Sequence, residues 1–272
     1  MPTRPPAIAG RFYPADPRAI ATTIEQIMAQ APEVTENAPQ PTALIAPHAG
    51  WVFSGVTAAH AYQHIAPYRQ SIHRVIILCP THREAVRGIA IPESDAFATP
   101  LGSIPLDTKV MQTLSPQPLV HTADSVHAFE HAIEVHLPFL QTLLDDFTLL
   151  PIAVGAIAPN DLQHLLEQIP FDHQTLFIVS TDLSHFHTAD EANTLDSTAI
   201  DWIDQGHTES LTPHHACGAN ILRGFLPFAR AQHWHTQFLH RSHSGEVSGD
   251  NERVVGYASW VVTSTLQPPA EH

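Results

Sequence analysis

Three histidines follow short apolar segments of the chain, each within a few residues of the segment's end. His48 follows the run ALIA, His82 follows RVIILC, and His185 follows LFIVS. Apolar runs of this length, rich in β-branched residues, predict buried strands of a parallel sheet. Ligands of such sheets bind outside the carboxyl ends of the strands, so we expect at least two of these histidines to share one site. The alternative is that each histidine caps its own strand.

Grouped imidazoles indicate a metal ion, because neutral histidine is the commonest protein ligand for zinc, copper and ferrous iron. Two imidazoles alone bind weakly, and Cys217 lies near the start of an expected helix, where the helix dipole favours a thiolate. A free cysteine is as often a small buried hydrophobe, so both interpretations of Cys217 stay open. Asp250 or Glu246 is the rival anionic ligand.

Two further groups are candidates for supporting roles. His185 is suited to act as a general base, with Asp182 either orienting it or forming a turn. Glu134 and His136 are two residues apart, so on a helix only one of them is expected to face inward, and for Glu134 a supporting or structural role is favoured over direct chemistry. Surface positions are expected for the histidines that follow no strand: His121, His127, His207, His233, His235, His240 and His243.

The elements that must position these residues alternate between apolar strands and helical patterns. This alternation predicts an α/β fold, a single domain over residues 1–272 with a largely parallel central sheet flanked by helices and a frayed tail at 266–272. Strands are expected at 42–46, 73–79, 148–154, 176–180 and 253–262. Helices are expected at 17–30, 55–65, 130–144, 159–168, 189–205 and 213–229, with Asp16, Ser54, Thr188 and Thr212 as N-caps.

Composition narrows the class of partner. The 272 residues are 43% hydrophobic, enough for a sizeable core, and 27 acidic residues against 12 Lys and Arg give a formal net charge of -15. A protein that binds the phosphate backbone of a nucleic acid needs a basic face, which this acidic composition does not provide. No nucleic-acid partner is therefore expected. No apolar run reaches the roughly 18 residues of a membrane helix, and two cysteines are too few for a disulfide scaffold. We therefore expect a cytoplasmic protein without a membrane partner.

Six blocks of the sequence, in order along nearly the whole chain, resemble the Memo family. They are RPPAIAGRFYP at 4–14, APHAGWVFSG at 46–55, EHAIEVHLPF at 130–139, STDLSH at 180–185, ACG at 216–218 and SGD at 248–250. The prokaryotic branch of that family is called AmmeMemoRadiSam system protein B. The resemblance implies a fold similar to the class III (LigB-type) extradiol dioxygenases, which are non-heme iron enzymes that open catechol rings. It also implies functional association with a radical SAM protein and an AMMECR1-domain protein.

The resemblance also implies a ligand set. In Memo proteins that bind iron or copper, the ligands are a histidine of the APHAG block, a histidine in the loop after the next strand and the cysteine of the CG block, which fall here on His48, His82 and Cys217. His185 matches the acid/base position of the dioxygenases, with Asp182 three residues before it. The chain departs from the commoner pattern at 81–83 and 218–220, which affects the shape of the substrate pocket.

The implied function is that of a redox enzyme with a mononuclear His/His/Cys site, acting on an unknown small-molecule substrate. Ferrous iron is the expected cofactor, with copper or zinc as alternatives. A thiolate is softer than the carboxylate of the dioxygenases and favours copper(I), zinc or a more easily oxidised iron, which argues against simple catechol cleavage. Two other functions stay open: a module that binds phosphotyrosine peptides in the same cleft, as a eukaryotic Memo protein does, and a zinc-dependent hydrolase.

Overall fold

A computed structural model of the protein describes residues 2–35 and 37–265, so the expected tail at 266–272 lies outside the described residues. Four parallel strands form the centre of the main sheet, in the order β2 (Pro41–Ala46), β9 (Thr175–Ser180), β3 (Arg74–Pro80) and β8 (Thr148–Val154). All four coincide with expected strands to within one residue. Their side chains are almost entirely buried, which explains the near-continuous apolar sequences.

Antiparallel pairs extend the sheet at both sides. Beyond β2 lies β12 (Val254–Ser264), which also pairs with β10 (His185–His187) and β11 (Trp234–His243). Beyond β8 lie β4 (Ile89–Ile91), antiparallel to β8, and β7 (Val120–Thr122). A separate small sheet consists of β1 (Thr3–Arg4), β5 (Ala96–Thr99) and β6 (Gly102–Pro105). The expected α/β class is confirmed, with a mixed sheet around a parallel centre.

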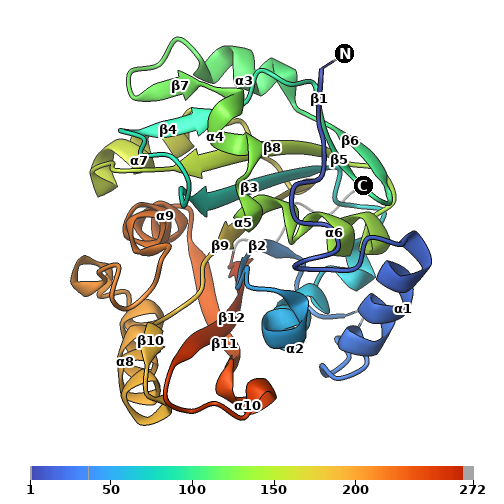
Figure 1. Ribbon diagram of the computed structural model, residues 1–272. Coiled ribbons are helices and arrows are strands. Elements are labelled where there is room, and N and C mark those ends of the chain that lie inside the picture. The colour runs from blue at the N-terminus through green and yellow to red at the C-terminus, as the bar shows by residue number, and fades with distance from the viewer. Residues whose placement is uncertain (1, 36, 266–272) are drawn as a thin grey trace.

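Helices cover both faces of the main sheet. Figure 1 shows α1 (Pro17–Met28), α2 (Trp51–Tyr62) and α6 (Leu137–Leu143) on one side, and α7 (Pro159–Glu167), α8 (Ala189–Gln205) and α9 (Ala219–Ala231) on the other. The shorter helices are α3 (Thr108–Leu114), α4 (Asp124–Ala128), α5 (His131–Glu134) and α10 (Gly245–Ser248). Among residues 2–35 and 37–265, no helix combines the length and the apolar composition that a membrane crossing requires.

Two of the four expected N-caps are correct. Asp16 accepts a hydrogen bond from the backbone of Ala19, and Thr188 forms a capping box with Glu191. The N-caps expected at Ser54 and Thr212 are wrong, because α2 begins earlier, at Trp51, and α9 begins later, at Ala219. Ser54 instead donates to the carbonyl of Ala49, inside the loop that carries His48.

The helix expected over 130–144 is broken into α5 and α6. Pro138 lacks an amide hydrogen and cannot continue the helix of the preceding turn, so a new helix begins at Leu137. Because of this break, Glu134 and His136 are both buried, and the expectation that only one faces inward is wrong. His127 is also buried, with Nε2 hydrogen-bonded to the carbonyl of Ala90, so its expected surface position is wrong too.

Glu134 has the structural role that the sequence favoured. Its carboxylate accepts hydrogen bonds from Arg4 Nη1 (2.7 Å), the backbone amides of Ala7 (2.7 Å) and Ile8 (3.1 Å), and Tyr13 OH (2.9 Å). Burial raises the pKa of Tyr13, and the adjacent carboxylate raises it further, so this hydroxyl stays a donor. Glu134 thereby fixes the segment of residues 4–13 against α5.

We expect Glu134→Ala to lower the free energy of unfolding by about 3–5 kcal/mol, because Arg4 becomes a buried charge without its partner. Asp145→Ala is the control: it also removes a carboxylate from an arginine pair, with Arg69, but this pair is exposed and is expected to contribute less than about 1 kcal/mol. Denaturant unfolding of both variants measures the difference. Equal losses would show that Glu134 does not anchor the segment.

Candidate metal centre

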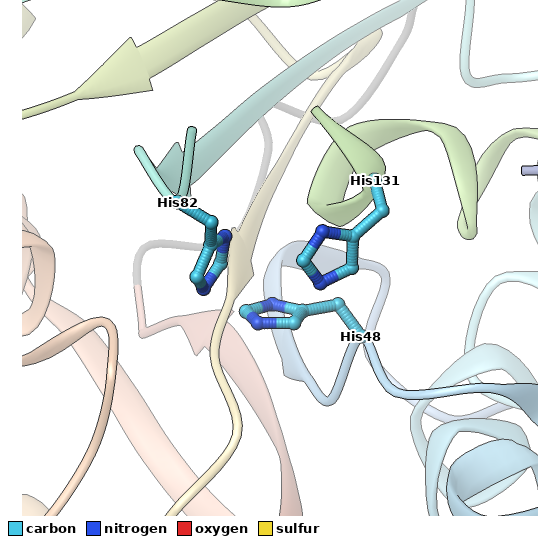
Figure 2. Close-up of side chains that lie close together, drawn as sticks. All are labelled: His48, His82 and His131. Atoms are coloured by element: carbon cyan, nitrogen blue, oxygen red, sulfur yellow. The ribbon is translucent and has the colours of Figure 1, made fainter. Parts of the chain in front are cut away.

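Three histidines meet at the carboxyl edge of the parallel strands. His48 lies two residues after β2 and His82 two residues after β3, while His131 is the first residue of α5. Each histidine has one ring nitrogen that lies within 4.8 Å of a ring nitrogen of each of the other two. Figure 2 shows the three rings turned toward a common space. The structure thus brings together two of the three strand-end histidines and adds one that the sequence analysis did not single out.

The protonation of His48 suits a cation. Burial lowers the pKa of His48 well below its usual value, and the neighbouring imidazoles of His82 and His131 lower it further. The ring centroids are 4.6 to 5.4 Å apart, and no hydrogen bond joins the three rings to one another in the described chain. Nitrogen lone pairs that converge without a shared proton are the donor set that a metal ion satisfies.

A buried hydroxyl sets the tautomer of His48. Ser180 Oγ donates to the carbonyl of Ala132 (2.7 Å), and because a hydroxyl has one proton, Ser180 must accept from both His48 Nδ1 (2.7 Å) and His136 Nε2 (3.0 Å). Burial lowers the pKa of His136 to about 3, so it is neutral and its Nδ1 accepts from Tyr62 OH (2.7 Å). The proton of His48 is therefore assigned to Nδ1, so Nε2 carries the lone pair that faces the cluster.

Glu130 orders the other two histidines. It caps α5, where Oε1 accepts from the backbone amides of His131 (2.9 Å) and Ala132 (3.1 Å). Oε1 also lies 2.9 Å from Nδ1 of His82 and 3.2 Å from Nδ1 of His131, and Oε2 accepts from the amide of His82 (2.7 Å). Burial alone would raise the pKa of Glu130, but the contacts from His131 and His82 outweigh it and lower the pKa, so the group is a carboxylate. Ligating histidines typically have such a carboxylate behind them.

Cys217 adjoins the three-histidine group without being part of it. Its Sγ lies 3.4 Å from Nε2 of His48 and accepts from the amide of Asp182 (3.2 Å). Gly218 allows this position, because its amide donates to Thr181 Oγ1 (2.9 Å) and a Cβ there would lie 2.6 Å from Thr181 Cβ. Burial, and then the charge of Asp182, raise the pKa of Cys217 to about 12, so the metal-free side chain is a thiol.

Asp182 supports His48 more directly than it supports His185. Its Oδ1 accepts from the amide of His48 (2.7 Å) and its Oδ2 lies 3.9 Å from His48 Nε2. Burial raises the pKa of Asp182, while the amide of His48 and then the charge of His185 oppose the rise. His185 Nδ1 donates to the carbonyl of Leu183 (2.8 Å), so its Nε2 carries the lone pair that a base requires.

The two rival anionic ligands are engaged elsewhere. Glu246 is exposed and accepts from the amide of His243 (3.0 Å), and Asp250 is exposed and accepts from the amide of Glu252 (2.9 Å). Within residues 2–35 and 37–265, neither carboxylate contacts the three histidines. Cys217 and Asp182 are thus the anionic candidates that reach His48.

Sequence reasoning missed His131 and Glu130, which lie inside one of the blocks that carry the family resemblance. Their signal was local: an acidic residue at the start of a helix caps it, and the histidine that follows is then fixed beside the carboxylate. No strand ends there, so the strand-end rule did not find them.

A pocket of about 430 Å³ opens beside the cluster, lined by both His82 and Cys217. Its other walls come from the loop after β3, the end of β8 and the start of α9. Any molecule in this pocket therefore lies next to His82 and Cys217.

Comparison with known proteins gives the family. The family model described as Memo-like protein matches residues 4–261. A MEMO1 family protein of Methanopyrus kandleri is 33% identical over 281 aligned residues, which cover 95% of this chain and 98% of that protein. MEMO1 family proteins of Methanobrevibacter smithii and Aquifex aeolicus are 32% and 27% identical, over 95% and 96% of this chain and 99% of each relative.

Among solved structures, an uncharacterized protein of Escherichia coli aligns with a TM-score of 0.47 at 15% identity, over 79% of this chain and 98% of that one. This likeness is too low to support any conclusion about function. The match of the family model over residues 4–261, together with relatives above 30% identity along nearly the full length, places the chain in the Memo family.

Proposed function

We propose that the protein is a metal-dependent oxidoreductase that holds one transition-metal ion between His48, His82 and His131, with Cys217 as the adjacent anionic donor. The observation that carries this proposal is the convergence of three imidazoles within 4.8 Å, each with its other ring nitrogen beside Ser180 or Glu130. Ferrous iron is the proposed ion, with copper and zinc as the alternatives, because imidazole suits all three and thiolate favours the softer ones.

Bound there, a redox-active ion would leave open positions for a substrate and exchange electrons with it. The chain's own groups supply the rest. Glu130 holds the tautomer of His82 and the hydroxyl of Ser180 holds that of His48. The partly buried His185 presents Nε2 as a base for a substrate hydroxyl. Such a base typically contributes about 10² to 10⁴ in rate. This division of roles follows the implied relation to the extradiol dioxygenases, with a thiol in place of their carboxylate.

A zinc-dependent hydrolase is the second candidate, and the three-histidine set itself favours it. Zinc with three histidine ligands keeps a fourth position for water and lowers the pKa of that water to about 7. In that case the same pocket would receive a hydrolysable ester or amide, and His185 would handle its protons.

Anaerobic reconstitution tests the ligand set. We expect the wild-type protein to take up one ferrous or cuprous ion per chain, and His131→Ala to retain little of it, because a third imidazole is lost. His121→Ala is the matched control, since this histidine is exposed and its Nε2 is hydrogen-bonded to the carbonyl of Arg87. Metal content by mass spectrometry gives the answer. Full uptake by His131→Ala would exclude the three-histidine site, and uptake of zinc alone would favour the hydrolase.

The pH dependence of metal binding tests Cys217. Because its thiol stays protonated up to about pH 12 in the metal-free protein, ligation must release that proton, and the apparent affinity should rise about tenfold per pH unit between pH 7 and 9. Cys217→Ser should lose this slope of one proton. Calorimetric titration in buffers of different ionisation enthalpy counts the protons. Identical slopes for the two proteins would remove Cys217 from the ligand set.

Removal of the hydroxyl behind His48 tests the tautomer assignment. We expect Ser180→Ala to weaken metal binding by about 10- to 100-fold, because His48 Nδ1 and His136 Nε2 lose their common acceptor. Ser259→Ala is the control, since its buried hydroxyl has no hydrogen-bond partner among the residues that the structure describes. Metal competition assays compare the two variants. Unchanged affinity in Ser180→Ala would mean that the hydroxyl does not prepare His48 for binding.

A further inference from the structure

The pocket beside the histidines has the size of a binding site for a small organic molecule. Its volume of about 430 Å³ lies within the range of roughly 300–1,000 Å³ that is usual for such sites. His82 and Cys217 form one wall, and the apolar side chains of Val154 and Ile221 contribute to others. A bound molecule would have one end at the candidate metal centre and the other toward the loop after β3.

That loop places one cationic side chain on the pocket. Arg83 follows His82 directly, lines the pocket, and has no hydrogen bond or ion pair in the part of the chain that the structure describes. Arg4, Arg69 and Arg74, by contrast, pair with the carboxylates of other residues: Glu134, Asp145 and Asp107. The planar guanidinium presents its donors in a fork that matches a carboxylate.

The surrounding charges favour a ligand with one negative charge over a ligand with two. Glu84 also lines the pocket, but its Oε2 accepts from Ser125 Oγ (3.1 Å), so this carboxylate has a partner of its own. The chain as a whole carries a formal charge of -15 and repels anions at long range. Arg83 and Glu84 carry opposite formal charges, so a bound monocarboxylate adds one uncompensated negative charge and a phosphate dianion adds two, and no second Arg or Lys of the described chain lines the pocket.

We propose that the pocket binds a small monocarboxylic acid whose carboxylate pairs with Arg83. The assignment of the molecule's other end to the metal centre rests on the proposed function above, while the pairing with Arg83 does not. Arg83 would then determine specificity: it would select substrates by their charge and hold the reacting end at His82 and Cys217. Asn220, at the start of α9, is a second polar group on the same pocket.

Benzoate, benzamide and phenyl phosphate are the probes, titrated into the full-length protein by NMR with and without metal. We expect benzoate to bind, to shift the backbone amide signals of Gly155 and Asn220, and to bind at least about tenfold more weakly to Arg83→Gln. Arg83→Lys should bind benzoate with an affinity between those of Arg83→Gln and the wild type, because lysine keeps the positive charge but lacks the paired N–H donors of the guanidinium. Benzamide should bind the wild type and Arg83→Gln equally. Arg87→Gln, on the same loop but outside the pocket lining, is the control and should bind benzoate as the wild type does.

The possible outcomes separate this proposal from the metal site. Equal affinity of wild type and Arg83→Gln for benzoate would overturn it, as would a preference for phenyl phosphate or an equal loss in Arg87→Gln. Metal stoichiometry is measured on the same samples. Arg83→Gln should keep its ion, because within the described residues no hydrogen bond or ion pair joins Arg83 to a proposed metal ligand. If no protein binds metal but benzoate still depends on Arg83, the proposed function fails and the anion site stands. If metal binds normally and Arg83→Gln binds benzoate as tightly as the wild type, the proposed function stands and the anion site fails.

Discussion

The buried carboxylate of Glu130 is the contact on which the candidate site depends. It ends the loop before α5, satisfies the first amides of that helix, and reaches Nδ1 of both His82 and His131. A charge in this position is costly unless each lone pair has a donor, and here the donors are supplied by the residues that the site must hold in place. The interactions that stabilise the carboxylate and those that orient the imidazoles are therefore the same.

This arrangement extends from the site into the fold. Arg4, from the N-terminal segment, donates to the backbone carbonyl of Glu130 (2.7 Å) while its Nη1 pairs with Glu134 one turn later. The carboxylate of Glu130, which caps α5, thus contacts the histidines, and that of Glu134, at the end of α5, contacts the start of the chain. Because both are buried, a shift of α5 would leave at least one charge without its partners, which keeps His131 in register with His48 and His82.

The sequence predicted the parts of this structure that follow from periodicity and the strand-end rule. Strand β8 and helix α8 have the expected bounds, and the ends of β2 and β3 deliver His48 and His82 to one edge as expected. Short strands such as β4 and β7 were missed, because three residues carry no readable period. The Ser180 hydroxyl could not be found either, since its partners lie 44 to 132 residues away in the sequence and only the tertiary structure brings them together.

The protonation states of the site differ in a way that suits metal uptake. His48 is neutral because burial and its neighbours disfavour a positive charge on its ring, and Glu130 is ionised because it is surrounded by donors. Cys217, by contrast, keeps its proton because it is buried next to Asp182, a group whose own pKa is raised by burial. An added cation would favour loss of the proton from the thiol, whereas His48 is already neutral. The positive charge of an ion bound by the histidines would thus convert the neighbouring thiol into a ligand.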